Sequence, residues 1–316
     1  IKLGRRIANH LQGDFYVLDA ERGVARVLLE ALTIDIAHFR GDDLLADLQG
    51  RDFAINAMAV DFFGDLSLLI DPLDGEQDAF RKWIQRCTPT SIADDPIRAL
   101  RAVRQSVQHG FRIEPKTQRD VRAQAAALSS ASPERVRDEF FAMLALKRPT
   151  QALRVADALG LLDEIVPQVV ALKGVSLPEP MRFDGWKHAI ETVDQLHRIL
   201  TTISYRRTDS TAASFAMGML AMQFDQFRAD LNTHINHTWP DHRSHWALLL
   251  FGALLNTTGY VTDGNPVEEA VAIAETTSGN LHLSNGEVKR LTAMLQHRVA
   301  AHRLDVSDKL ALHRYW

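Results

Sequence analysis

The order of apolar and polar positions separates a first part with mixed α and β signals from a helical remainder. Alternation of apolar with polar residues predicts short strands, at residues 15–18, 25–29, 32–37 and 66–70. Apolar residues spaced by three and four positions predict helices at residues 1–11 and 55–60. We therefore expect an α+β arrangement in the first part of the chain, with a mixed sheet and helices.

After residue 90 the pattern changes to one helix after another. Asp94-Asp95-Pro96 is typical of a helix start, because an acidic side chain can accept backbone N–H bonds and proline fits the first turn. That helix is predicted to end at Gly110, and further helices follow, at residues 116–128, 133–146, 150–162 and from 186 onward. Two prolines in the segment 175–180 predict a linker.

Composition restricts the partners less than the motifs do. The chain has 316 residues and a formal net charge of −4, so any contact with nucleic acid would depend on a local basic face. The single cysteine, Cys87, excludes an internal disulfide and fits a reducing compartment. Apolar runs are too short to span a membrane and no signal-peptide pattern is present, so we expect a cytoplasmic protein without membrane contact.

Asp95 and Arg98 form the clearest candidate site. Three residues apart on a predicted helix, they are neighbours near its first turn. A carboxylate beside a guanidinium suits the base edges of cytosine and adenine and not those of uracil and guanine. A helical wheel places both away from the apolar face of Ile97, Leu100 and Val103. The structural alternative is a capping aspartate in a surface ion pair, which contributes under about 1 kcal/mol.

Two further groups have the chemistry of a nucleotide site. Arg51, Asp52 and Asn56 combine a guanidinium suited to a triphosphate with a carboxylate and an amide suited to ribose hydroxyls. Their structural alternative is a helix cap in front of core residues. Arg101 follows Arg98 on the exposed side of its helix and is a candidate phosphate contact, whereas Arg104 lies at the apolar edge and is predicted to be a structural tether.

Five segments that include these residues occur in one order along the chain: Gly50-Arg51-Asp52-Phe53-Ala54-Ile55-Asn56-Ala57-Met58-Ala59, Asp71-Pro72-Leu73-Asp74-Gly75, Asp95-Pro96-Ile97-Arg98, Arg101-Ala102-Val103-Arg104 and Ser132-Pro133-Glu134-Arg135. Together they resemble the motifs of the class II tRNA nucleotidyltransferase (CCA-adding enzyme) and bacterial poly(A) polymerase family, whose members extend RNA 3′ ends without a template. The resemblance implies that Asp95 and Arg98 pair with CTP and ATP.

The same resemblance assigns supporting roles and reveals departures. Nucleotide and sugar contacts are expected from Arg51, Asp52 and Asn56, and a helix beginning near Glu134 is expected to brace the base-reading helix, with Arg135 as a partner. Gly50 and Ala54 stand where the family has arginine and threonine, and Gln105 where it has an aromatic residue. Asp71-Pro72-Leu73-Asp74-Gly75 is expected to be an architectural turn.

The resemblance also implies three parts: the C-terminal part of a nucleotidyltransferase head at 1–88, a helical neck with the base-reading helix at 89–165, and a helical, RNA-binding body at 166–316. Phosphate contacts are expected from basic residues, namely Arg119, Arg122, Arg137, Lys147 and Arg148. In the body, Asn256 and Thr257 stand where HD-type phosphohydrolases have a His-Asp metal pair, so we expect a degenerate HD-like scaffold in which His188 is a remnant.

Nucleotide addition requires divalent metal ions held by carboxylates. In the resembling family an Asp-x-Asp strand supplies most of them, and that motif would lie before Ile1. Asp35 is the candidate for a further catalytic carboxylate and metal ligand, and the alternative is an exposed strand aspartate. We therefore expect Mg²⁺ as a cofactor bound mostly outside this chain, ATP and CTP as substrates, and no nucleotide addition by this chain alone.

The function predicted from these residues is template-independent addition of C, A or both to tRNA 3′ ends, with tRNA or another RNA 3′ end as the partner. The alternatives are a poly(A) polymerase, a non-catalytic RNA-binding module derived from such an enzyme, and an HD phosphohydrolase. His234, His237, His242 and His245 have a spacing that can suit zinc. Because Pro240 interrupts that run, we expect these histidines to face solvent or RNA.

Overall fold

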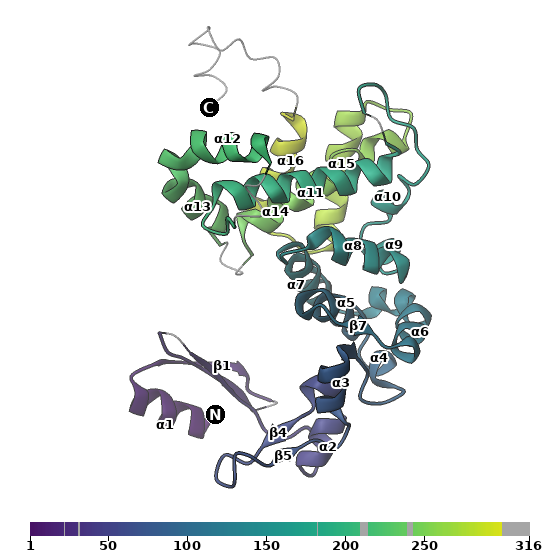
Figure 1. Ribbon diagram of the computed structural model, residues 1–316. Coiled ribbons are helices and arrows are strands. Elements are labelled where there is room, and N and C mark those ends of the chain that lie inside the picture. The colour runs from purple at the N-terminus through teal and green to yellow at the C-terminus, as the bar shows by residue number, and fades with distance from the viewer. Residues whose placement is uncertain (22, 31, 182, 209–213, 239–242, 299–316) are drawn as a thin grey trace. The chain divides into compact units, whose positions relative to one another are not determined.

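The computed structural model describes residues 1–21, 23–30, 32–181, 183–208, 214–238 and 243–298, and it confirms the α+β fold (Figure 1). The chain divides into two compact units. Residues 1–80 with 86–91 form the first unit, and residues 81–85 with the chain from 92 onward form the second. Apart from residues 89–91, the predicted neck and body lie in the second unit, and the boundary between them stays a prediction.

The first unit begins with a helix packed on a small sheet. Its elements are α1 (Lys2–Leu11), β1 (Asp14–Asp19), β2 (Val24–Leu28) and β3 (Thr33–Ile36). Ala8 of α1 and Ala25 and Val27 of β2 are buried. The strand order is β1-β2-β3, and both pairings are antiparallel, in place of the expected mixed sheet. Consecutive strands joined by short links pair in this way, because a parallel pair needs a long crossover.

The rest of the first unit differs from its predicted helix at 55–60. The chain forms α2 (Leu44–Gln49), η1 (Ala54–Asn56), β4 (Ala59–Val60), β5 (Leu69–Ile70) and α3 (Gly75–Arg81). The prediction was wrong because Ala59 and Val60 pair with β5 instead of continuing a helix. Gly75 allows close approach to this turn, since a Cβ there would lie 2.2 Å from the Ala54 carbonyl oxygen.

The helical character of the later chain is confirmed. It contains β6 (Trp83–Ile84), α4 (Ser91–Asp94), α5 (Ile97–His109), β7 (Arg112–Ile113), α6 (Pro115–Ala123), η2 (Ala125–Ser130), α7 (Pro133–Leu144), α8 (Pro149–Ala158), α9 (Leu162–Ile165), α10 (Pro167–Val170), α11 (Gly185–Ile203), α12 (Phe215–Phe224), η3 (Asp225–Phe227), α13 (Arg228–Asn236), α14 (His245–Leu255), η4 (Thr258–Val261), α15 (Pro266–Asn280) and α16 (Asn285–Gln296). The short parallel pair of β6 with β7 was not predicted. Among the described residues, no helix is both long and apolar enough to cross a membrane.

Helix α7 lies at the centre of the second unit, where it packs against α5, α8 and α14 (Figure 1). Phe140 and Phe141 are buried on α7 and meet Phe251 of α14, with ring centroids 5.7 and 5.5 Å apart. Aromatic edge-to-face contacts of this kind add to the energy of burial. The apolar side of α7 therefore fixes it against α14 while its polar sides remain available for other contacts.

Candidate functional site

The start of α5 places Asp95 and Arg98 on consecutive turns. Pro96 is the N-cap residue, and the Asp95 and Pro96 carbonyls accept hydrogen bonds from the backbone amides of Arg98 and Ala99, both at 3.0 Å. Helix α5 ends at His109, and the following Gly110 has a left-handed φ of 69°, as expected for a glycine after a helix. The predicted helix therefore exists, but α5 has no side-chain hydrogen bond at its N-cap.

The carboxylate of Asp95 is directed to the neighbouring helix α7 instead of to its own backbone. Its Oδ2 accepts a hydrogen bond of 2.7 Å from Nη2 of Arg135. The side chain of Asp95 is 26% exposed, and Arg98 is also partly exposed. Asp95 is thus held by a charged donor while part of its surface remains accessible to a ligand.

A second ion pair joins the same two helices one turn further along. Glu139 of α7 accepts a hydrogen bond of 2.6 Å from Nε of Arg104, and Nε of Arg101 lies 3.9 Å from its other carboxylate oxygen. Arg104 and Glu139 are each about one-fifth exposed, whereas Arg101 is 38% exposed. Arg104 therefore tethers α5 to α7, and Arg101 stays accessible beside it.

In the first unit, Arg51 is held by a carboxylate that the sequence analysis did not single out. Asp47 of α2 is buried, and its Oδ2 accepts from Nη2 of Arg51 at 2.9 Å while Oδ1 accepts from the Arg40 amide at 2.9 Å. Burial alone would raise the pKa of Asp47, but these bonds from Arg40 and Arg51 keep that pKa below its usual value. Arg51 is 49% exposed, so its guanidinium is positioned and still accessible.

Asp52 and Asn56 form a compact pair next to this arginine. Asp52 is 7% exposed, and its Oδ1 accepts from the Phe53 amide at 2.9 Å and from Nδ2 of Asn56 at 3.0 Å. Asn56, at the end of η1, is partly exposed. The burial of Asp52 favours a role in orienting Asn56 over direct contact with a ribose.

Asp35 lies in a cross-strand ion pair. Its two carboxylate oxygens accept from Nε and Nη2 of Arg26 on β2, at 2.7 and 2.9 Å. The hydrogen bond from Arg26 lowers the pKa of Asp35. Among the described residues, no group of three or more histidine, cysteine, aspartate or glutamate side chains is arranged to hold a metal ion.

The five predicted phosphate contacts fall into two classes. Arg119, Arg122, Lys147 and Arg148 are exposed. Arg137 is 8% exposed, and it donates from Nη1 to the His282 carbonyl at 2.7 Å and from Nε to Asp138 at 2.9 Å. A guanidinium enclosed in this way binds protein groups, which favours a structural role for Arg137 over the expected phosphate contact.

A guanidinium contacts the position that corresponds to the HD motif. Asn256 follows α14, and Nη1 of Arg298 donates to its carbonyl oxygen and, at 3.2 Å, to its Oδ1. Thr257 is 2% exposed. A fixed positive charge at this position opposes binding of a metal cation, which agrees with a degenerate scaffold and argues against an HD phosphohydrolase.

The described histidines of the predicted run lie together, whereas Pro240 and His242 lie outside the described residues. The ring centroid of His245 is 5.0 Å from those of His234 and His237. His245 is 6% exposed, so the expectation that it faces solvent was wrong. Burial, together with the nearby charge of Arg290, lowers the pKa of His245, which keeps its imidazole neutral.

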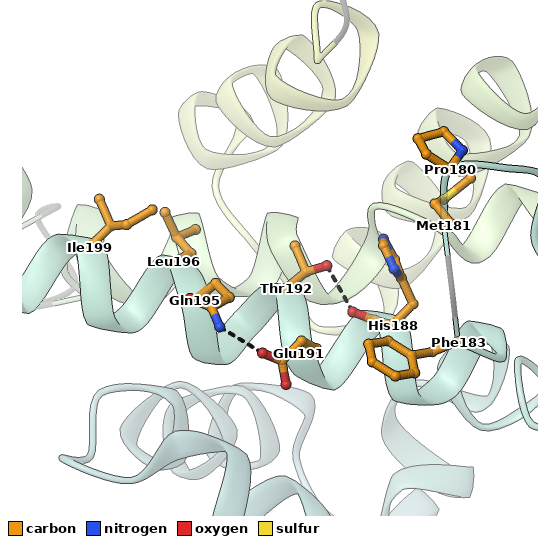
Figure 2. A pocket seen from close by; sticks show the side chains of 9 residues that line it. All are labelled: Pro180, Met181, Phe183, His188, Glu191, Thr192, Gln195, Leu196 and Ile199. Carbon is orange, nitrogen blue, oxygen red and sulfur yellow. Dashed lines mark hydrogen bonds between the residues drawn. The ribbon is translucent and has the colours of Figure 1, made fainter. Parts of the chain in front are cut away.

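An open, mainly apolar groove of about 580 Å³ runs along α11 (Figure 2). Its lining comes from the segment before the helix and from one helical face, namely Pro180, Met181, Phe183, His188, Glu191, Thr192, Gln195, Leu196 and Ile199. Nε2 of Gln195 donates to Glu191 at 2.7 Å within this lining. The groove lining includes His188, the predicted remnant of an HD-type ligand, and none of the candidate nucleotide contacts named in the sequence analysis.

Two contact groups of the structure had no clear signal in the sequence. One is Asp47, which is an ordinary helix residue by pattern. The other is the buried pair of Arg243 with Glu287, in which Nε and Nη2 of Arg243 each donate to a carboxylate oxygen at 2.7 Å. These residues are 44 positions apart in the chain, so their contact depends on the tertiary fold.

Comparison with known proteins confirms the resemblance to the tRNA nucleotidyltransferase and poly(A) polymerase family. A family model described as "Probable RNA and SrmB- binding site of polymerase A" matches residues 110–172. The CC-adding tRNA nucleotidyltransferase of Synechocystis sp. is 37% identical over 162 residues, which cover 51% of this chain and 38% of that protein. The A-adding tRNA nucleotidyltransferase of Deinococcus radiodurans is 33% identical over 211 residues, 65% of this chain and 46% of that protein. The chain spans about a third to a half of these curated relatives.

Solved structures share the fold. One described as "Structure of tRNA-processing enzyme complex 3" has a TM-score of 0.63 at 18% identity, covering 99% of this chain and 72% of that chain. Another, "Crystal structure of tRNA nucleotidyltransferase complexed with a primer tRNA and an incoming ATP analog", has a TM-score of 0.53 at 19% identity, covering 96% and 88%.

Proposed function

We propose that this chain supplies base selection and RNA binding to a template-independent nucleotidyltransferase that adds C, A or both to tRNA 3′ ends. The observation that carries the proposal is the placement of Asp95: partly exposed just before α5, and held at 2.7 Å by Arg135. A carboxylate with a fixed orientation can accept from the exocyclic amino group of cytosine or adenine, while Arg98 donates to the neighbouring ring nitrogen.

The discrimination follows from hydrogen-bond chemistry. Uracil and guanine present a carbonyl oxygen where cytosine and adenine present an amino group, so the Asp95 carboxylate would face another acceptor. Leaving polar groups unpaired in this way costs more than a good pair gains, and a well-oriented pair discriminates by about 1–3 kcal/mol. Arg101 beside this pair, and Arg51 with Asn56 in the first unit, are proposed to contact phosphate and sugar groups.

The proposed RNA contacts are the exposed basic residues of the second unit, Arg119, Arg122, Lys147 and Arg148. All four lie within residues 110–172, where the RNA-binding family model matches. The names of the relatives support tRNA as the substrate class, since they are CC-adding, A-adding and multifunctional CCA proteins. That this chain also acts on tRNA is part of the proposal, and so is a cytoplasmic location.

The proposed reaction requires a divalent metal ion. Asp35 is engaged by Arg26, and the described residues contain no complete ligand set. We retain Asp35 as a candidate ligand that would have to release Arg26 and be joined by other carboxylates. The steps attributed to this chain are base selection, orientation of the nucleotide and binding of the RNA backbone.

The proposal is tested by giving the 316-residue chain a tRNA that lacks its 3′-terminal CCA, together with single nucleotides and MgCl₂. We expect salt-dependent tRNA binding and tighter binding of CTP and ATP than of UTP and GTP, with no extension by this chain alone. Binding of tRNA without any nucleotide preference would favour the non-catalytic RNA-binding module, and extension of unrelated RNA by ATP alone would favour a poly(A) polymerase.

A further inference from the structure

Helix α7 carries charged side chains on two different faces. Arg135 and Glu139, four residues apart, face α5 and bind Asp95 and Arg104. Glu134 and Asp138, also four residues apart, lie with Arg137 on another face, because residues at such spacings share one side of a helix. The first face holds Asp95 of the candidate base-reading pair, so a contact that fixes the second face also affects the orientation of the first.

The second face of α7 clasps one residue, His282, at two points. Nη1 of Arg137 donates to the His282 carbonyl at 2.7 Å, and Nδ1 of His282 lies 2.7 Å from Oε1 of Glu134. The Ser132 hydroxyl, with the contact to His282, lowers the pKa of Glu134 to about 2, so its carboxylate is charged at neutral pH. Arg137 is almost fully buried, whereas the contact of Glu134 with His282 is about half exposed.

His282 lies in a short connection that is itself firmly held. It joins α15 to α16 and has a φ of 50°, a left-handed conformation that is uncommon for residues other than glycine. The next helix, α16, starts with a capping box between Ser284 and Glu287. Glu287 is fully buried and binds Arg243 through both carboxylate oxygens. The clasp therefore attaches α7 to a rigid point of the C-terminal helices.

We propose that Arg137 is a positioning residue for base selection. By holding α7 to the connection at His282, it fixes the orientation in which Arg135 presents its guanidinium to Asp95. This inference rests on the proposed function, because it concerns the same base-reading pair, and it extends that function to a contact with the C-terminal helices. Arg137 itself touches neither nucleotide nor RNA in this proposal.

The test replaces Arg137 by methionine, which keeps the length of the side chain and removes its donors. Arg137→Lys is the conservative variant, since its ammonium can still donate to the His282 carbonyl. Glu134→Gln weakens only the exposed half of the clasp and serves as a second variant if Arg137→Met folds poorly. Arg154→Met, which changes an exposed arginine on α8, is the matched control.

Two readouts follow the effect from the clasp to the site. The first is the ratio of the dissociation constants for CTP and UTP, which does not depend on the fraction of folded chain because unfolded molecules bind neither. The second is hydrogen exchange at the amides of Arg98 and Ala99, the first hydrogen bonds of α5. We expect Arg137→Met to lower the CTP preference by about 2- to 10-fold, which lies within the range for residues that act through others and does not exceed the loss expected when Arg135 itself is replaced, and to speed this exchange.

We expect Arg137→Lys to recover part of both effects, Glu134→Gln to show a smaller loss, and Arg154→Met to match the wild type. An Arg137→Met variant with unchanged CTP preference and unchanged exchange at Arg98 and Ala99 would overturn the inference and leave the proposed function intact. A wild-type chain without any preference for CTP over UTP would instead refute the proposed function, and the inference would fall with it.

Discussion

Arg135 on α7 donates a hydrogen bond of 2.7 Å to the carboxylate of Asp95, which lies immediately before α5. This contact joins residues 40 positions apart. The sequence analysis predicted Arg135 as a partner of the base-reading helix, and in the described part of the chain it contacts the Asp95 side chain directly. It converts an aspartate at a helix start, a common surface feature, into an oriented acceptor. The proposed base selection depends on that orientation.

Removing the donor from Asp95 should therefore weaken discrimination before it weakens overall binding. We expect Arg135→Met to reduce the preference for CTP over UTP about 3- to 10-fold, because one charge-assisted hydrogen bond that orients the acceptor is lost. Dissociation constants for the two nucleotides measure this ratio. Arg135→Lys keeps a charged donor, so its preference for CTP over UTP should lie between those of the wild type and Arg135→Met. A ratio unchanged in Arg135→Met would show that Asp95 needs no partner.

The tether of α5 to α7 should contribute to stability. Glu139→Gln removes the charge that binds Arg104 at 2.6 Å and lies near Arg101, in a setting that is mostly shielded from water. We expect a loss of about 1–3 kcal/mol in the free energy of unfolding, between the values for exposed and buried pairs, measured by urea denaturation. Glu164→Gln, at an exposed position on α9, is the control and should change little.

Binding of RNA should depend on the exposed basic residues and not on Arg137. We expect replacement of Arg119, Arg122, Lys147 and Arg148 by alanine to make the dependence of tRNA affinity on salt less steep, by about 0.7 to 0.9 in logarithmic slope for each lost contact. Titrations at several salt concentrations measure this slope. Lys2→Ala, in the first unit, is the control. A slope that is the same in all variants would place the RNA elsewhere.

Acid should destabilise the second unit through its buried imidazoles. Burial, aided by the charge of Arg290, lowers the pKa of His245 in the folded chain below the value of 6.5 that applies when it is exposed. Protons then bind the unfolded state more readily, so the stability contributed by neutral His245 is complete above pH 6.5 and is lost as pH falls through the lower folded pKa. Urea denaturation between pH 7.5 and 5 measures the loss.

The matched variant for this pH dependence is His245→Gln, whose side chain does not titrate. It should unfold more easily at neutral pH, because the packing against His234 and His237 changes, but its stability should fall less between pH 7.5 and 5. A decline as steep as that of the wild type would assign the acid sensitivity to other groups, of which His197 is the first candidate, since burial also lowers its pKa.

Local signals in the sequence predicted the parts of the fold that depend on neighbouring residues. The start at Pro96, the left-handed end at Gly110 and the alternation in β1 to β3 are set by residues within a few positions, and the structure confirms these elements. The prediction of a helix at 55–60 was wrong because a short apolar run is compatible with either a helix or a strand. In the structure, Ala59 pairs with Ile70 as part of a strand.

In the candidate site, the sequence predicted the roles of residues that belong to recognisable motifs, and it did not predict contacts between distant residues. Arg104 was expected to be a tether and binds Glu139. Arg137 was expected to contact phosphate, because nothing in its sequence neighbourhood indicates that the carbonyl of His282, 145 residues away, encloses it. Asp47 was missed for the same reason, since its burial and its contact with the Arg40 amide follow from the turn of the chain around α2.

The most direct test of base selection compares the dissociation constants of CTP, ATP, UTP and GTP for the wild-type chain and for Arg98→Ala. The wild type should bind CTP and ATP at least about tenfold more tightly than UTP and GTP, as expected for one well-oriented pair of hydrogen bonds, and Arg98→Ala should remove most of that difference. Equal binding of the four nucleotides by the wild type, or a preference that survives in Arg98→Ala, would contradict the account.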